Sequence, residues 1–374
     1  MPLITAGALV YDGRLCRPGW LRVSGSRIDA GGSGAPPGPA DVDFPDALLV
    51  PGFVDMHVHG GGGVSYHDNP GRAAAFHRRH GTTATLASLM SAAPDALLAA
   101  VRTLAAATRQ GLVDGIHLEG PWLSEQRCGA HDRRQLRDPD TAEVDALLAA
   151  GDGAIRMVTL APELPGSGAA IKRFVEAGVV VAVGHTDASY EQTRAAIDAG
   201  ATVGTHLFNA MGGLHHRAPG PALALLDDPR VTVELIADGV HLHPAWIRHV
   251  IETAGPGRVA LVTDAMAAAG VGDGAFRLGG LDVDVVAGVA RLRGTSTIAG
   301  STATTDQLFA TAMGCLGRSD AALVAAVQLT STTPARTLGL DGVGGLGAGY
   351  QANVVVLDQD LHVLRVMAGG QWCD

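Results

Sequence analysis

Short apolar runs that end in polar residues alternate with amphipathic stretches through most of the chain. The runs at residues 179–183 and 259–262 are apolar throughout, which is typical of strands buried on both faces. The stretches at residues 191–201 and 244–255 have the spacing of apolar positions found in helices. Because strands and helices alternate in this way, we predict an α/β protein with a (β/α)8 TIM-type barrel over residues 51–341.

The two ends of the chain have a different pattern. Residues 3–13 and 20–30 are β-like, a Gly/Pro-rich loop at residues 31–40 follows them, and the tail at residues 352–373 is again β-like. Such segments on both sides of a barrel predict a second, small β-sandwich domain built from both termini. We assign it to residues 1–50 plus 342–374.

Composition narrows the possible partners and the compartment. With 374 residues, of which 47% are hydrophobic, the chain can bury a barrel and a small domain. The net charge of -10 argues against nucleic acid or a membrane surface as a partner. The four cysteines are far apart, and the N-terminus lacks a basic stretch followed by an apolar core. We therefore expect a soluble protein of the reducing cytoplasm.

Three polar residues that follow apolar runs are candidate metal ligands. Glu119, His185 and His206 each lie at the predicted end of a strand, and the carboxyl ends of barrel strands share one rim. One carboxylate and two imidazoles make a three-ligand catalytic site for a divalent metal, with Zn²⁺ as the first choice. Taken alone, Glu119 would be a solvated loop residue.

A histidine pair at the end of the first barrel strand is a candidate second site. Side chains alternate along a strand, so His57 and His59 point to the same side and can share a cation. The alternative is a hydrogen-bonded pair in a polar loop.

Asp264 and His131 are candidates for proton transfer and for polarisation of a carbonyl. Asp264 ends a late strand, where a carboxylate can take a proton from water and return it to a leaving group, although it could also cap a helix. His131 lies in a loop at residues 122–132 that could cover the mouth, or it could be a surface histidine. The loop at residues 212–220, with its histidines and arginine, could bind an anion or could simply be solvated.

The motifs together resemble a known family. PGFVDMHVHGGGG, HLEGPWLS with CGAHD, VAVGHTDASY, THLFNAM with HRAPG, ELIADGVHLHP, LVTDAM and AGSTAT occur in order over almost the whole chain. In this order they resemble the N-acetylglucosamine-6-phosphate deacetylases of the amidohydrolase superfamily. PGxxDxHxH alone marks only the superfamily, whereas HLEGP, THLFNAM and IADGVH together are specific.

The resemblance assigns roles to individual residues. It implies that Glu119, His185 and His206 bind the main metal, that Asp264 is the general base and acid, and that His131 orients or polarises the acetamide carbonyl. Asn209 and Ala210 would contact the sugar. Arg217 and His241 would bind the 6-phosphate, with His241 coming from a neighbouring subunit of a homodimer. His57 and His59 resemble the family members that hold a second metal.

The implied reaction is metal-dependent hydrolysis of N-acetyl-D-glucosamine 6-phosphate to D-glucosamine 6-phosphate and acetate, in amino-sugar catabolism and cell-wall recycling. The partner is then a small amino-sugar phosphate. The alternatives are deacetylation of N-acetylgalactosamine 6-phosphate, hydrolysis of another small N-acyl compound, or a catalytically silent assembly protein. The chain departs from the common pattern at Ala218 and Ala303, near the mouth, and at Tyr350 and Asn353 in the tail.

Overall fold

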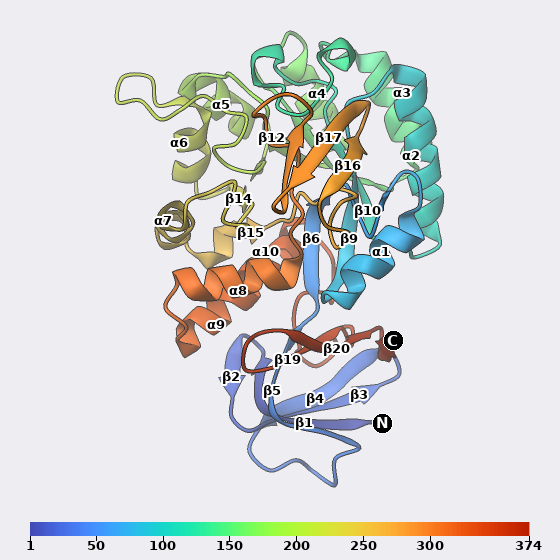
Figure 1. Ribbon diagram of the computed structural model, residues 1–374, viewed down its shortest axis with the longest axis vertical. Helices are drawn as coiled ribbons and strands as arrows, with labels where there is room; N and C mark the ends of the chain where they lie inside the picture. The colour runs from blue at the N-terminus through green and yellow to red at the C-terminus, as the bar shows by residue number, and fades with distance from the viewer. Residues whose placement is uncertain (374) are drawn as a thin grey trace.

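The computed structural model describes residues 1–373, which form a barrel joined end to end with a smaller β domain (Figure 1). The barrel sheet has eight strands in the order β15, β14, β13, β12, β11, β10, β9, β6, and neighbouring strands are parallel. At the two ends of this order, the backbone N–H of Asp264 donates to the carbonyl of His57 at 2.9 Å. The strands are β6 (Phe53–Val58), β9 (Thr82–Leu89), β10 (Gly115–Glu119), β11 (Ile155–Leu160), β12 (Val180–Val183), β13 (Val203–Gly204), β14 (Thr232–Leu235) and β15 (Val259–Leu261).

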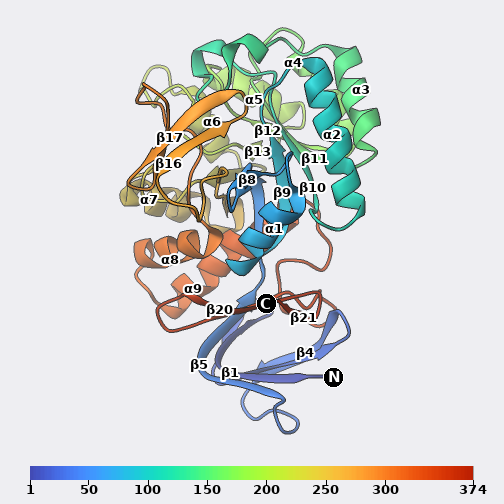
Figure 2. The ribbon, with the colours of Figure 1, turned by 45° about the vertical axis from the view of Figure 1, so that its right-hand side comes forward.

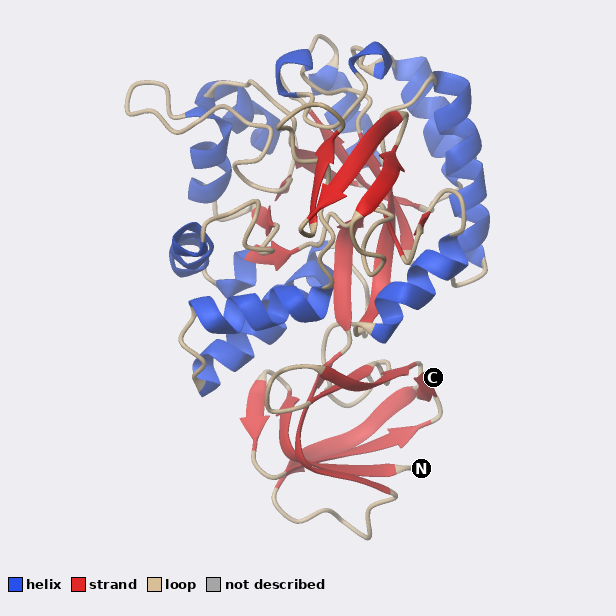
Figure 3. Cartoon of the chain, in the orientation of Figure 1, coloured by secondary structure: helices blue, strands red, loops and turns tan. Residues whose placement is uncertain are grey.

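Helices surround the barrel sheet (Figure 3). Local sequence explains where several of them begin: Pro94 and Pro244 occupy first-turn positions, and Ser189 forms a capping box with Gln192. The helices are α1 (Pro70–Arg79), α2 (Pro94–Arg109), α3 (Thr141–Gly151), α4 (Ser167–Glu176), α5 (Tyr190–Asp198), α6 (Gly220–Asp227), α7 (Pro244–Ala254), α8 (Thr305–Cys315), α9 (Asp320–Val327) and α10 (Thr333–Thr337). Alternation of strands and helices around a parallel sheet confirms the predicted barrel.

Two apolar layers hold the barrel together. One cluster joins side chains of several strands, including Met56, Leu86, Met157 and Ile236, and fills the interior. The larger cluster packs the outer faces of the strands against the helices. Because both faces are covered, the strands are predominantly apolar, as the runs in the sequence predicted, and the polar residues within them, such as Asp55, His117 and Glu234, are buried.

A three-stranded antiparallel excursion lies over one side of the barrel mouth (Figure 2). It consists of β16 (Gly274–Leu278), β17 (Leu281–Val286) and β18 (Val289–Leu292). Its Leu278 and Val283 pack with Ala130 and Met266, which belong to loops that leave the carboxyl ends of β10 and β15. The excursion therefore forms part of the wall of the mouth.

The small domain contains strands from both ends of the chain. They form one mostly antiparallel sheet in the order β21, β20, β19, β5, β1, β3, β4, with β2 paired to β1, around a core that includes Ile4, Leu21 and Val354. The strands are β1 (Leu3–Tyr11), β2 (Arg14–Cys16), β3 (Gly19–Ser24), β4 (Arg27–Ser33), β5 (Val42–Pro51), β19 (Val354–Leu357), β20 (Val363–Ala368) and β21 (Gln371–Cys373).

The predicted pairing of the two termini outside the barrel is confirmed, and the strands join in one continuous sheet. We propose the domain division given above, of which residue 374 lies outside the described part. None of the helices in residues 1–373 combines the length and apolar character that a membrane span requires.

Candidate active site

The polar residues predicted at strand ends meet at the carboxyl-end rim of the barrel. Glu119 closes β10, while His185 and His206 each lie two residues after β12 and β13. All three are buried, with 2–5% of their surface exposed. A buried carboxylate and buried imidazoles are stable only when they pair with one another or bind a cation. The three side chains are therefore expected to do one or the other.

The first cluster has the donor arrangement of a cation site. The Nε2 atoms of His185 and His206 lie 3.0 and 3.2 Å from the same Oε1 of Glu119, and 3.0 Å from each other. His185 Nδ1 lies 2.9 Å from the carbonyl of Arg127, so it carries the proton and donates, which leaves the Nε2 lone pair facing the cluster. Two nitrogens and a carboxylate oxygen that converge in this way fit a divalent metal.

The second cluster adjoins the first. His59 Nε2 lies 3.2 Å from both Asp264 Oδ1 and Glu119 Oε2, and His57 Nε2 lies 3.4 Å from Glu119 Oε1. Within residues 1–373, His57 Nε2 is buried without a hydrogen-bond partner, as expected for an atom that binds a cation. His57, His59 and Asp264 offer ligand atoms within 4.8 Å of one another. The residues of this cluster therefore also fit a metal ion.

The backbone around the clusters is strained. His185, His206 and Asp264 have φ values of 48°, 28° and 47°, in the left-handed region that residues other than glycine rarely adopt. Such conformations persist only where the surrounding structure enforces them, and they concentrate at functional sites. Three of them around one cavity make this rim a candidate active site.

His131 reaches the first cluster from the loop after β10. Its Nε2 lies 3.2 Å from Glu119 Oε2. Its Nδ1 accepts the backbone N–H of Ser91 at 3.3 Å and lies 2.9 Å from the Ser91 hydroxyl. Burial lowers the pKa of His131 to about 4, so the ring is neutral at neutral pH. A neutral ring that accepts at Nδ1 carries its proton on Nε2, which makes His131 a hydrogen-bond donor toward the cavity.

Comparison with known proteins gives the family. The Amidohydrolase family matches residues 48–373. The chain belongs to the amidohydrolase family.

Individual relatives of this amidohydrolase are more specific. It is 56% identical, with a TM-score of 0.97, to a mutant N-acetyl-D-glucosamine-6-phosphate deacetylase from Mycobacterium smegmatis in complex with N-acetyl-D-glucosamine-6-phosphate; the match covers 99% of this chain and 98% of that one. It is 30% identical, with a TM-score of 0.88, to the N-acetylglucosamine-6-phosphate deacetylase of Thermotoga maritima, over 99% and 98% of the two chains. It is 39% identical to an N-acetylgalactosamine-6-phosphate deacetylase of Escherichia coli O157:H7, over 96% of each chain.

The Mycobacterium smegmatis and Thermotoga maritima relatives confirm the predicted resemblance to N-acetylglucosamine-6-phosphate deacetylases, and with it the prediction that the chain is a hydrolase. The roles of individual residues are not decided by the relatives and stay predictions. The geometry of this amidohydrolase shows which of those residues lie together.

The predicted sugar-binding residues of this amidohydrolase line the same cavity as the clusters. The cavity measures about 300 Å³, and Asn209, Ala210 and His241 are among its lining residues. His241 is mostly buried within its own chain, where its Nδ1 lies 2.8 Å from Asp238 Oδ2. Its predicted reach into a neighbouring subunit stays a prediction.

Arg217 lies apart from this cavity. It is exposed on the loop between β13 and α6, which projects from the side of the barrel (Figure 1), and it does not line the cavity. Its Nη1 contacts Nε2 of the neighbouring His216 at 2.8 Å. The structure thus brings together all the predicted site residues except Arg217.

Sequence reasoning missed two buried residues that support the site. Glu234, in β14, lies with Oε2 3.1 Å from His57 Nδ1 and accepts the backbone N–H of His206 at 3.1 Å. Ser91 holds His131, as described above. A glutamate inside the apolar run VTVELIA was a visible signal for the first. The serine carried none.

A third histidine near the site has a structural role. His117 is completely buried in β10, where Nδ1 lies 2.9 Å from the Ser88 hydroxyl and Nε2 lies 2.8 Å from the Thr159 hydroxyl. Both ring nitrogens are therefore satisfied by neutral hydroxyls, and burial lowers the pKa of His117 well below its ordinary value. His117 is a neutral, hydrogen-bonded core residue.

Proposed function

We propose that this amidohydrolase hydrolyses the acetamide of N-acetyl-D-glucosamine 6-phosphate to D-glucosamine 6-phosphate and acetate. The observation that supports this most strongly is the cavity in which Asp264 and His131 flank a convergent set of nitrogen and oxygen donors. The relative from Mycobacterium smegmatis, which binds that sugar phosphate, supports the choice of substrate. A catalytically silent role is disfavoured because the donor set is complete.

A divalent cation, which we propose to be Zn²⁺, would be held by Glu119, His185 and His206, and there it would make water more acidic and polarise a carbonyl oxygen. We also propose a second, weaker site at His57 and His59. Two neutral imidazoles attract a cation less than a set that includes a carboxylate. The second site must therefore share Glu119 or Asp264.

Asp264 is proposed to move the proton in this reaction. Burial raises the pKa of Asp264, but without a metal the protonated His57 and His59 outweigh that effect and hold the pKa at about 2. With a cation bound, the histidines would be neutral and the charge of the cation would favour the ionised carboxylate in the same way, so Asp264 is a base at neutral pH. Asp264 takes a proton from the attacking water and delivers it to the nitrogen as the C–N bond breaks. His131 donates its Nε2–H to the carbonyl oxygen, where negative charge develops.

The experiment that tests this function is a deacetylation assay with a panel of N-acetylated sugar 6-phosphates and their unphosphorylated forms. We expect N-acetylglucosamine 6-phosphate to have the highest kcat/KM. The Escherichia coli relative makes N-acetylgalactosamine 6-phosphate the second candidate, and a higher kcat/KM for that epimer would replace our proposal with it. Absence of acetate release from every member of the panel would refute both.

The two-metal arrangement predicts the result of a metal analysis. His57→Ala/His59→Ala should bind fewer divalent ions per chain than wild type but still at least one, because the Glu119 cluster remains intact. Elemental analysis after dialysis measures this directly, without an activity assay. His215→Ala/His216→Ala, which removes an exposed histidine pair, is the matched control and should leave the stoichiometry unchanged. Equal metal content in wild type and His57→Ala/His59→Ala would exclude the pair as ligands.

Two further proposals concern the surroundings of the enzyme. All four cysteines are free, which supports a reducing cytoplasm.

We also propose a homodimer. The apolar residues Leu214, on the projecting loop, Val240, on the loop after β14, and Trp246, in α7, are exposed, and a partner subunit would bury them.

A further inference from the structure

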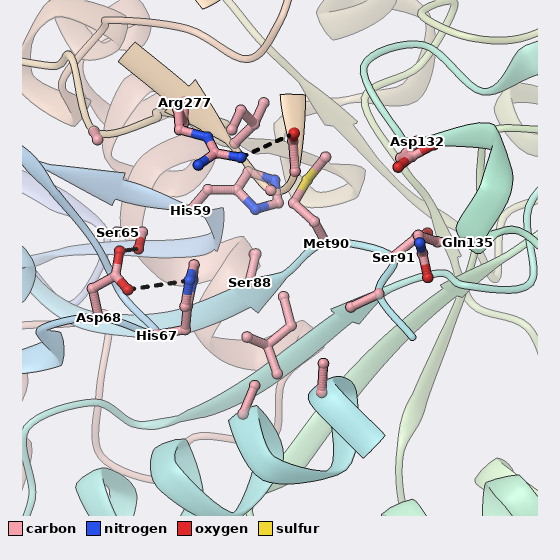
Figure 4. Close-up of a pocket in the computed structure, with 18 of the residues that line it drawn as sticks. His59, Ser65, His67, Asp68, Ser88, Met90, Ser91, Asp132, Gln135 and Arg277 are labelled. Atoms are coloured by element: carbon pink, nitrogen blue, oxygen red, sulfur yellow. Dashed lines mark hydrogen bonds and ion pairs between the residues drawn. The ribbon is translucent and has the colours of Figure 1, made fainter. Parts of the chain in front are cut away.

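A second cavity, whose lining is drawn in Figure 4, is larger than the catalytic one and shares lining residues with it. It measures about 910 Å³ and extends between β16, the first turns of α2 and the loop at residues 63–68. Three of its lining residues, His59, Met90 and Leu278, also line the catalytic cavity. The two cavities are therefore neighbours with a shared boundary, and one of the three boundary residues is a proposed metal ligand.

The boundary between the two cavities lies on the side of the barrel mouth opposite the proposed sugar contacts. Met90 follows directly after β9, whereas Asn209 and Ala210, the proposed sugar contacts, follow after β13. In the order of the eight strands, β9 and β13 are four positions apart. Strands four positions apart in an eight-stranded barrel lie on opposite sides of its mouth. The sugar side and the second cavity thus face each other across the proposed metal site.

The shape of a secondary amide connects these two sides. The trans amide is planar and places the carbon attached to nitrogen and the carbon attached to the carbonyl at opposite ends. If the sugar ring lies toward β13, the methyl group of the acetamide points toward Met90 and the boundary. Any extension of the acyl group would then leave the catalytic cavity in the direction of the second one.

We propose that the second cavity, here called the acyl chamber, receives N-acyl chains longer than acetyl, so that N-butyryl- and N-hexanoyl-glucosamine 6-phosphate are also substrates. This inference rests on the proposed deacetylase function and extends its substrate class. The reaction is the same: the oxygen of water bonds to the acyl carbon, the C–N bond breaks, and a proton passes to the nitrogen. The products are glucosamine 6-phosphate and the corresponding carboxylate.

The lining of the acyl chamber combines polar residues, such as Ser65, Asp68 and Gln135, with an apolar wall that can hold a hydrocarbon chain. Leu89, Leu97, Ala100 and Phe276 contribute apolar surface, while charged side chains such as Arg277 belong to exposed parts of its wall. Met90 at the boundary is unbranched and adaptable, so it can change rotamer to admit a chain. Burial of methylene groups on this apolar wall would compensate for ordering the chain.

The test compares kcat/KM for the N-acetyl, N-butyryl and N-hexanoyl derivatives of glucosamine 6-phosphate. In a closed hydrophobic pocket, one methylene too many changes kcat/KM by roughly 10- to 200-fold. With an open chamber we expect the N-butyryl and N-hexanoyl substrates to stay within about tenfold of the N-acetyl substrate.

Substitutions in α2 test where the acyl chain of the substrate lies. Ala96 lines the acyl chamber but not the catalytic cavity, and Ala99, one turn along the same helix, lines neither. Both are exposed alanines in α2, so both substitutions should be tolerated by the fold. Ala96→Trp should lower kcat/KM for the N-hexanoyl substrate at least tenfold and leave the N-acetyl substrate at wild-type values. Ala99→Trp should change neither.

The outcomes separate the two proposals. Hydrolysis of the N-acetyl substrate with a more than hundredfold loss for both longer substrates would overturn the acyl chamber and leave the deacetylase function intact. Equal hydrolysis of the N-hexanoyl substrate by wild type, Ala96→Trp and Ala99→Trp would also overturn it, because the chain would then lie elsewhere. No hydrolysis of the N-acetyl substrate would refute the function itself.

Discussion

Asp264→Asn should retain the fold and the metal content of the wild-type enzyme while kcat falls about 10²–10⁴-fold, the usual contribution of a general acid–base. The amide cannot accept a proton from the attacking water, so both the attack and the protonation of the leaving nitrogen lose their catalyst. Asparagine is the suitable replacement because it has nearly the same shape and tolerates the left-handed backbone at φ 47°.

The measurement combines steady-state kinetics with elemental analysis and thermal unfolding of the same preparation. Asp360→Asn, at an exposed position of the small domain, is the matched control and should behave as wild type. A kcat for Asp264→Asn within a few-fold of wild type would remove Asp264 from the mechanism. A loss of metal together with activity would instead indicate that Asp264 is mainly a ligand, which its distance of 3.2 Å from His59 permits.

The second large effect concerns the 6-phosphate. Replacing either Arg217 or His241 by alanine should lower kcat/KM for the phosphorylated substrate roughly ten- to a hundredfold, because a hydrogen bond to a charged group contributes about 1.5–3 kcal/mol. A dianion needs local cationic donors on a protein with a net charge of -10, and the planar fork of Arg217 suits phosphate.

Subunit mixing tests whether one phosphate site uses both chains. His241 lines the catalytic cavity of its own chain, whereas Arg217 lies on a projecting loop outside it. If the two residues meet across a dimer interface, a heterodimer of Arg217→Ala and His241→Ala contains one intact site and one doubly damaged site. Mixing the two homodimers under exchange conditions should restore up to half of the wild-type activity per heterodimer. If exchange is demonstrated and activity does not recover, the phosphate site lies within one chain, or one of the residues does not bind phosphate.

The fold class and most of the site could be predicted from the sequence. Apolar runs that end in Glu119, His185, His206 and Asp264 indicated strands buried on both faces, and the parallel barrel then required their carboxyl ends to share a rim. These four residues could be assigned to one rim because the order of residues along each strand can be read from the sequence, and all strands of a parallel barrel run in the same direction. Polar residues placed directly after such runs must gather at one end of the barrel.

The geometry within that rim depends on the tertiary structure. The register between β6 and β9 shifts between Asp55 and Val58, and an irregularity of this kind can re-aim side chains. Met56 packs in the barrel interior while the next residue, His57, contacts Glu119 at the mouth. Simple alternation would place neighbouring residues on opposite faces. The pairing with β9 decides where the alternation breaks.

The supporting contacts are also decided by the tertiary structure. His57 meets Glu234 although 177 residues separate them in sequence, and His131 meets Ser91 across 40 residues. The acyl chamber likewise depends on how β16 packs beside the end of β9. The sequence by itself determined the strands, their direction and the chemistry at their ends, because hydrophobic periodicity records which residues are buried. The choice of partner for each buried polar atom, and the open space left between loops, follow from the closure of the barrel, which brings strands far apart in sequence into contact.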